Sequence, residues 1–100
     1  MKQTIANVYQ FRDAFAEAGR KDQFRYEGLQ VLWDYLEDYE NEMGVELECD
    51  VIGFCVDYSE DTEEDIRRAY SIDEDEDIEE YLEGHFIGRT DKGTIVYQNH

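Results

Sequence analysis

Apolar residues recur every three or four positions through the first 43 residues, which is the spacing of amphipathic helices. Val8, Phe11 and Phe15 predict a first helix over residues 6–18. A second series predicts a longer helix over residues 26–43, with acidic side chains on its polar face. The apolar residues of this second series are Leu29, Leu32, Trp33 and Leu36.

Residues suited to helix ends flank both segments. Asn7 or Thr4 can cap the start of the first helix through its side-chain oxygen. Gly19 and Gly44 follow the two helices and can take the left-handed conformation that ends a helix.

The middle of the chain changes period. Residues 45–50 alternate apolar and acidic side chains, and residues 51–56 (VIGFCV) are nearly continuously apolar, which predicts one strand buried on both faces at its end. In an extended strand, Cys49 and Cys55 lie about 20 Å apart. A disulfide needs Cα atoms within about 7 Å, so we expect two buried free thiols, as in a reducing cytoplasm.

The remaining predicted elements are short. Thr62 and Asp65 have the spacing of a capping box, which predicts a third helix starting near Asp61 or Thr62. Helical spacing in residues 77–83 predicts a fourth helix, and residues 86–89 and 94–98 flank a turn as the two strands of a hairpin. The order is therefore α-α-β-α-α-β-β, an α+β fold with helices packed on a small, largely antiparallel sheet. Nothing in residues 1–100 divides the chain, so we expect a single domain.

Charge sharpens this picture. The 100 residues carry 27 acidic and nine Lys or Arg side chains, a formal net charge of −18. All of the excess lies in residues 34–83, where 22 acids face two arginines. Small domains are soluble with a net charge of about 2–8 in magnitude, and larger charges cost stability through self-repulsion. A solvated surface is the ordinary explanation of one acidic run, but confinement to half of the chain favours a specific use.

Several kinds of chemistry lack their residues. The two histidines, His85 and His100, do not adjoin a nucleophile in a strand–turn–helix context, so we expect no enzyme. The aspartates of residues 73–77 have the spacing of the first EF-hand ligands, but Ile78 and Gly84 stand where that loop needs Gly and Glu. We therefore expect no metal site and no cofactor. Direct nucleic-acid binding needs basic patches, and membrane insertion needs about 20 apolar residues; the chain offers neither.

The acids of the second helix approach the charge density of nucleic acid. Six acids follow a helix roughly 25 Å long, and a nucleic-acid strand of that length carries about seven phosphates. Such a surface could occupy the basic groove of a nucleic-acid-binding protein of the host. The candidate partner-binding residues are Asp34, Glu37, Asp38, Glu40, Glu42, Glu60, Asp61, Glu63 and Glu64.

Two stretches in the first 59 residues of the chain carry a resemblance. Residues 24–59 read FRYEGLQVLWDYLEDYENEMGVELECDVIGFCVDYS, and residues 10–15 read QFRDAF. This text resembles small acidic proteins of phages and other mobile elements. In size and charge the chain is similar to phage anti-defence proteins, the anti-CRISPR and antirestriction inhibitors. The resemblance implies a stoichiometric inhibitor that mimics DNA and blocks a CRISPR effector or restriction enzyme in the cytoplasm of the bacterial host. It carries over no individual functional residue.

A second hypothesis stays open. Tyrosine is favoured at protein interfaces, and five tyrosines lie among the acids: Tyr35, Tyr39, Tyr58, Tyr70 and Tyr81. The chain could therefore be a phage interaction module that binds through Tyr and apolar contacts, with the acids giving only solubility. Whether most of these rings edge the core, whether residues 71–77 are ordered without a partner, and whether the protein forms a homodimer are left open by the sequence.

Overall fold

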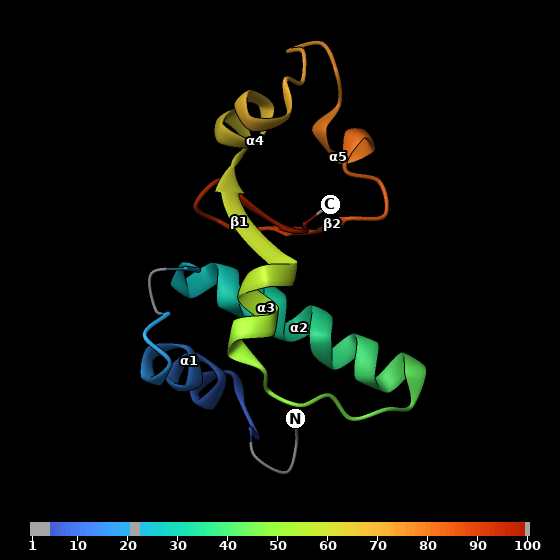
Figure 1. Ribbon diagram of the computed structural model, residues 1–100. Helices are drawn as coiled ribbons and strands as arrows, with labels where there is room; N and C mark the ends of the chain where they lie inside the picture. Colours follow the sequence, from blue (N-terminus) through green and yellow to red (C-terminus); the bar gives the residue numbers. More distant parts are fainter. Residues whose placement is uncertain (1–4, 21–22, 100) are drawn as a thin grey trace.

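Five helices and three strands form within residues 5–20 and 23–99, the part of the chain that the computed structural model describes (Figure 1). In chain order they are α1 (Val8–Glu17), α2 (Tyr26–Met43), α3 (Val51–Asp57), β1 (Tyr58–Thr62), α4 (Glu63–Tyr70), α5 (Ile78–Tyr81), β2 (Phe86–Arg89) and β3 (Thr94–Gln98). The mixture of helices with a small antiparallel sheet confirms the α+β prediction, and the order differs from the expected one by one additional helix, α3.

The first two helices agree with their sequence patterns. The side chain of Asn7 accepts a hydrogen bond from the main-chain N–H of Gln10 and caps α1. Gly19 and Gly44 follow α1 and α2 with φ of 74° and 66°. This left-handed conformation strains residues with a Cβ, so glycine is suited to both positions.

The prediction of a strand over residues 45–56 is wrong. Residues 45–50 form an irregular segment, and the apolar run VIGFCV lies in α3. The side chain of Asp50 accepts from the N–H of Gly53 and so caps the start of this helix. A short apolar run does not distinguish a buried strand from a buried helix by period alone. Here the cap and the burial of Val51 and Phe54, three residues apart, define the helix.

The correction also changes the setting of the cysteines. Cys49 precedes the cap of α3 and Cys55 lies within the helix, so the extended spacing assumed for them does not apply. Both thiols are free, as expected, but each is half-buried rather than buried. Partial burial raises the pKa of both thiols, which keeps them protonated near neutral pH.

The sheet has the strand order β1-β3-β2, and both pairings are antiparallel. The predicted hairpin is therefore confirmed as β2 and β3. The central strand β3 is buried on both faces, because its side chains alternate between them. Val96 belongs to the core on one face, and Ile95 and Tyr97 belong to the core on the other.

Each face of the sheet has its own core. Figure 1 shows α2 crossing below the sheet with α1 and α3, while α4 and α5 lie above it. The lower core, which we call the α2-side core, is rich in aromatic rings. Its ring of Phe11 lies 5.1 Å from that of Phe15 and 5.3 Å from that of Trp33. The upper core, the α4/α5-side core, is mostly aliphatic: Ile66, Ile72, Ile78, Leu82, Ile95 and Tyr97.

Side chains cap the starts of the remaining helices, at Thr62 as predicted and at Asp77. Thr62 accepts from the N–H of Asp65 at the start of α4, and Asp77 accepts from the N–H of Glu79 at the start of α5. Stacking helices on both faces of a small sheet gives the described chain an elongated shape, with extents of 45 × 29 × 22 Å.

Candidate functional site

The acids of α2 divide into an outward row and one inward side chain. Asp34, Asp38 and Glu42 are exposed and follow one another at intervals of four residues, so they lie in a row along one side of the helix. Glu37 is half-buried beside this row. Helix α2 contains no Lys or Arg, and within residues 5–20 and 23–99 no basic nitrogen lies within 4.0 Å of the three exposed carboxylates. We call these three residues the α2 acidic row.

Glu40 has a different position from its neighbours. Its side chain is only 5% exposed, and its Oε2 accepts a 2.7 Å hydrogen bond from the main-chain N–H of Leu47. This bond ties the irregular segment 45–50 back onto α2. The spacing of acids along the helix did not distinguish Glu40 from the others, although Glu40 also falls on the apolar period of the helix.

Glu60 and Asp61 are held inside the fold by donors of their own chain. Glu60 accepts from the main-chain N–H of Arg25 at 2.6 Å and from the Thr94 hydroxyl at 2.5 Å, so it joins β1 to the start of α2 and to β3. Asp61 points to the opposite face, where it accepts a 2.7 Å bond from the Tyr97 hydroxyl. Burial and this hydrogen bond raise the pKa of Tyr97. Both carboxylates therefore act first as structural acceptors.

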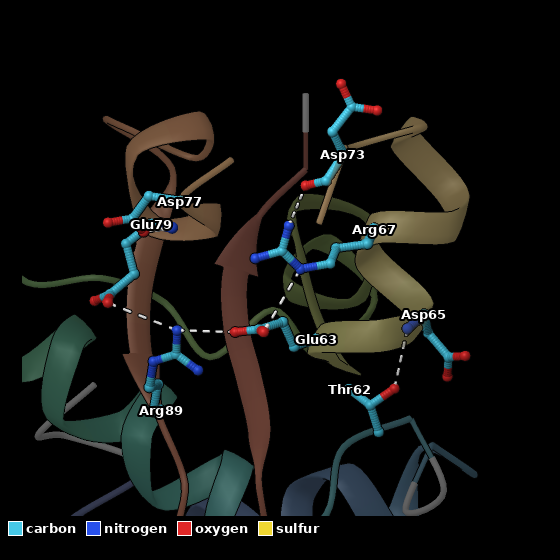
Figure 2. Close-up of polar contacts among 8 residues, drawn as sticks. All are labelled: Thr62, Glu63, Asp65, Arg67, Asp73, Asp77, Glu79 and Arg89. Carbon is cyan, nitrogen blue, oxygen red and sulfur yellow. Dashed lines mark hydrogen bonds and ion pairs between the residues drawn. The ribbon is translucent and has the colours of Figure 1, made fainter. Parts of the chain in front are cut away.

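Glu63 and Glu64 lie at the start of α4 next to arginines. Figure 2 shows Arg89 reaching from β2 to Glu63 and to Glu79 of α5, with N–O distances of 3.1 and 3.6 Å. Arg67 pairs with Glu63 at 3.5 Å and donates to the main-chain oxygen of Asp73 at 2.6 Å (Figure 2). We call this set of contacts the arginine clasp, because it joins α4, α5 and the acidic segment between them to the hairpin.

Glu64 belongs to a more exposed pair. It lies 2.9 Å from Arg68 across one turn of α4, and the two side chains are 83% and 71% exposed. Pairs this exposed contribute at most about 1 kcal/mol to stability and hold their charges loosely. The nine predicted residues thus do not form one surface: the α2 acidic row lies apart from the acids of β1 and α4.

Three of the five tyrosines that lie among the acids pack their rings against the two cores. The ring of Tyr35 packs at 6.0 Å from that of Tyr58, and Tyr70 lies 6.5 Å from Tyr97, so these rings edge the two cores. Burial, followed by the neighbouring Tyr35 and Asp57, raises the pKa of Tyr58 to about 12.

Sequence reasoning missed the two most exposed tyrosines, which lie outside the acidic half of the chain. Tyr9 is 66% exposed and Tyr26 is 60% exposed. The interface hypothesis covered only tyrosines that lie among the acids, and Tyr9 and Tyr26 precede residue 34.

Exposed apolar side chains mark the end of α2 and the outer face of α3. They are Met43, Val45, Ile52 and Val56, which are 48–67% exposed, together with Tyr39 at 39%. Ile52 and Val56 are four residues apart and so share the outward face of α3. Exposed apolar surface of this kind is typical of protein–protein interfaces.

The same surface was compared with the needs of metal binding and membrane insertion over residues 5–20 and 23–99. There, no group of three or more His, Cys, Asp or Glu side chains is arranged to hold a metal ion. No helix in those residues combines the length and the apolar character needed to cross a bilayer.

No protein-family model, curated protein or solved structure matches this chain. Its function must therefore be argued from the chemistry of its own surface.

Proposed function

We propose that this protein is a stoichiometric inhibitor of a nucleic-acid-binding defence protein, a CRISPR effector or a restriction enzyme, and that it works by mimicking nucleic acid. The observation that carries the proposal is the α2 acidic row. Asp34, Asp38 and Glu42 are exposed and evenly spaced, and no basic nitrogen of the described chain lies within 4.0 Å of their carboxylates.

The spacing of the row fits a basic groove. A helix rises about 1.5 Å per residue, so carboxylates four residues apart repeat every 6 Å or so. Phosphates of one DNA strand repeat about every 3.4 Å along the axis. The row alone therefore carries about half the linear density of a strand, and Glu27 and Glu37, both half-buried on the same helix, raise it further.

The fixed position of the α2 acidic row also favours binding to a basic groove. The α2 acidic row stands on an 18-residue helix whose opposite face is buried in an aromatic core, so the charges are positioned before binding. Preorganised charge steers a basic partner electrostatically and costs little ordering on association. Binding of this kind weakens steeply as salt rises, because salt screens the attraction between exposed charges.

A pair of matched triple variants tests the proposal. The protein is first used to capture its target from a bacterial host lysate, with bound proteins eluted by a salt gradient and identified by mass. The triple variant Asp34→Asn, Asp38→Asn, Glu42→Gln should then bind that target at least ten-fold more weakly, equivalent to about 1.4 kcal/mol. It should also lose inhibition of the target's DNA cleavage.

The control removes the same charge elsewhere. Asp73→Asn, Asp75→Asn, Glu74→Gln neutralises three exposed acids outside α2. Inhibition should survive in this control. Equal inhibition by both triple variants, or a target without any nucleic-acid function, would contradict mimicry by the α2 acidic row.

The second candidate function is a protein interaction module that binds through apolar contacts. The exposed Ile52 and Val56 on α3 favour it. The double variant Ile52→Ser, Val56→Ser would then lose the partner while the α2 triple variant kept it, and the captured partner would resist high salt.

A further inference from the structure

A hollow of about 240 Å³ lies between the first turns of α1 and α2 and the turn of the β2–β3 hairpin. Tyr9 and Arg12 of α1 and Tyr26 and Val31 of α2 line it, together with Arg89 and Thr90 of the hairpin. The hollow draws its walls from three elements that are distant in sequence. Its lining residues all lie outside the acidic half of the chain, and one of them, Arg89, also belongs to the arginine clasp.

Arg12 has a fixed position in this hollow. Its guanidinium carbon lies 3.4 Å from the centre of the Tyr26 ring and 5.8 Å from that of Tyr9. Its Nε and Nη2 donate to the main-chain oxygen of Tyr26 at 3.3 and 3.0 Å. Stacking and hydrogen bonding therefore orient the guanidinium before any ligand arrives.

The outer end of the guanidinium keeps its binding capacity. A guanidinium has five N–H donors, and the two bonds to Tyr26 use two of them. For the other three, residues 5–20 and 23–99 provide no acceptor within hydrogen-bonding distance and no carboxylate within 4.0 Å. Arg67, Arg68 and Arg89 each lie within 4.0 Å of a carboxylate, so Arg12 differs from them despite the large excess of acids.

The surroundings of Arg12 select among anions. The exposed Tyr9 and Tyr26 rings offer flat apolar surface, and Tyr and Arg are the residues most enriched in interface hot spots. Glu27 and Asp91 also line the hollow and repel a strand of many negative charges. One carboxylate beside an aromatic or aliphatic group meets the guanidinium without approaching several acids at once.

We propose that this hollow is a binding site for a single carboxylate next to an apolar group on a partner polypeptide, such as a C-terminus or an acidic side chain beside an aromatic residue. Arg12 receives the carboxylate through its Nη1 and Nη2 edge in the paired geometry typical of arginine. The tyrosine rings pack against the neighbouring apolar group. The carboxylate would meet Arg12, Tyr9 and Tyr26, none of which belongs to the α2 acidic row, so either proposal can fail without the other.

NMR titration of the isotope-labelled full chain tests the site with defined probes. N-acetylphenylalanine carries the carboxylate and the ring, and N-acetylphenylalanine amide carries the ring alone. The acid should shift the signals of Tyr9, Tyr26, Thr90 and the Arg12 Nε–H, and the amide should bind at least ten-fold more weakly. Equal binding of acid and amide, or no shift at these residues with the acid, would overturn the proposal.

Two further arms separate the alternatives. Inorganic phosphate should bind at least ten-fold more weakly than the acid; phosphate binding as tight as the acid's would show a general anion site instead. Arg12→Lys keeps the charge but loses the paired geometry, so it should bind N-acetylphenylalanine at least three-fold more weakly.

Lys92→Gln serves as the matched charge control, because Lys92 lies in the same hairpin turn but does not line the hollow. It should leave binding of the acid unchanged. An equal loss in Lys92→Gln and Arg12→Lys would show that the effect is not specific to Arg12 and would overturn the site. If Arg12→Lys proves unfolded by thermal melting, the ranking of acid, amide and phosphate on the unaltered chain still decides the outcome.

Discussion

The two faces of the sheet employ their acids differently. On the α2 side, the core is aromatic, and the acids of the α2 acidic row are exposed, with no basic nitrogen of the described chain within 4.0 Å. On the α4/α5 side, the core is smaller and mostly aliphatic, and the arginine clasp pairs two of the acids, Glu63 and Glu79, with arginines.

This contrast shows that the number of acids does not measure the negative surface that a partner meets. Glu40 and Glu60 are consumed as internal acceptors, and Glu63 is shared by two arginines. Other acids, among them Asp73, Glu74 and Asp75, are exposed too, but the α2 acidic row stands on an 18-residue helix packed on the aromatic core. The following predictions test the contrast from the largest expected effect to the smallest.

Glu60→Ala should lower the free energy of unfolding by about 1–3 kcal/mol, because it leaves the N–H of Arg25 and the hydroxyl of Thr94 without their acceptor. Chemical denaturation at neutral pH measures the change. Asp34→Ala, which removes an exposed acid from the α2 acidic row, is the control and should change stability by less than about 0.5 kcal/mol. Similar losses in the two variants would show that Glu60 is not a structural acceptor.

Stability should fall in alkali because buried tyrosines resist ionisation in the folded state. Tyr58 has a pKa of about 12 in the fold against its ordinary 10, so the unfolded chain loses this proton first. The contribution is complete below pH 10 and is lost as pH rises towards 12. Denaturation curves from pH 9 to 12 should decline less steeply in Tyr58→Phe than in the unaltered chain.

Tyr97 extends this test to the other face of the sheet, since its pKa is raised by burial and by its bond to Asp61. Tyr97→Phe should also flatten the alkaline decline, and it should cost about 1 kcal/mol at neutral pH through the lost hydrogen bond. An alkaline decline identical in both variants and in the unaltered chain would show that neither ring is protected.

Arg89→Gln should have the smallest effect, at most about 1 kcal/mol, because the arginine clasp is partly exposed. The loss should shrink as the salt concentration rises from about 0.05 to about 0.5 M, because salt screens the attraction between exposed charges. Hydrogen exchange should quicken in α5 but not in α2. Arg68→Gln, which breaks only exposed pairs within α4, is the control and should leave exchange in α5 unchanged.

Local patterns predicted most of the fold. Helical spacing, Asn7, Thr62 and the glycines at the helix ends placed α1, α2 and α4 within a few residues, since each signal lies in adjacent turns of chain. The pattern failed at VIGFCV, where the cap by Asp50 and the packing of Phe54 against Phe11, at 6.1 Å, decide for a helix. The run that is buried on both faces as a strand is TIVYQ, in β3.

The acidic site was harder to predict, because proximity across the fold decides which acids are free. The sequence around Glu60 does not predict its hydrogen bonds to Arg25 and Thr94, which are 35 and 34 residues away along the chain. Likewise, the hollow around Arg12 depends on the hairpin turn reaching the start of α2. The row of Asp34, Asp38 and Glu42 was predictable because helical period alone sets it.

The central position of β3 has a consequence for how the protein folds. This strand supplies side chains to both cores and pairs with β1, whose residues precede it by more than 30 positions. Neither face can close before that distant strand arrives, so loop closure precedes the gain from packing. The helices of the two faces, although they touch different cores, are therefore expected to gain and lose their structure as one cooperative unit, with β3 as the shared member whose departure exposes both.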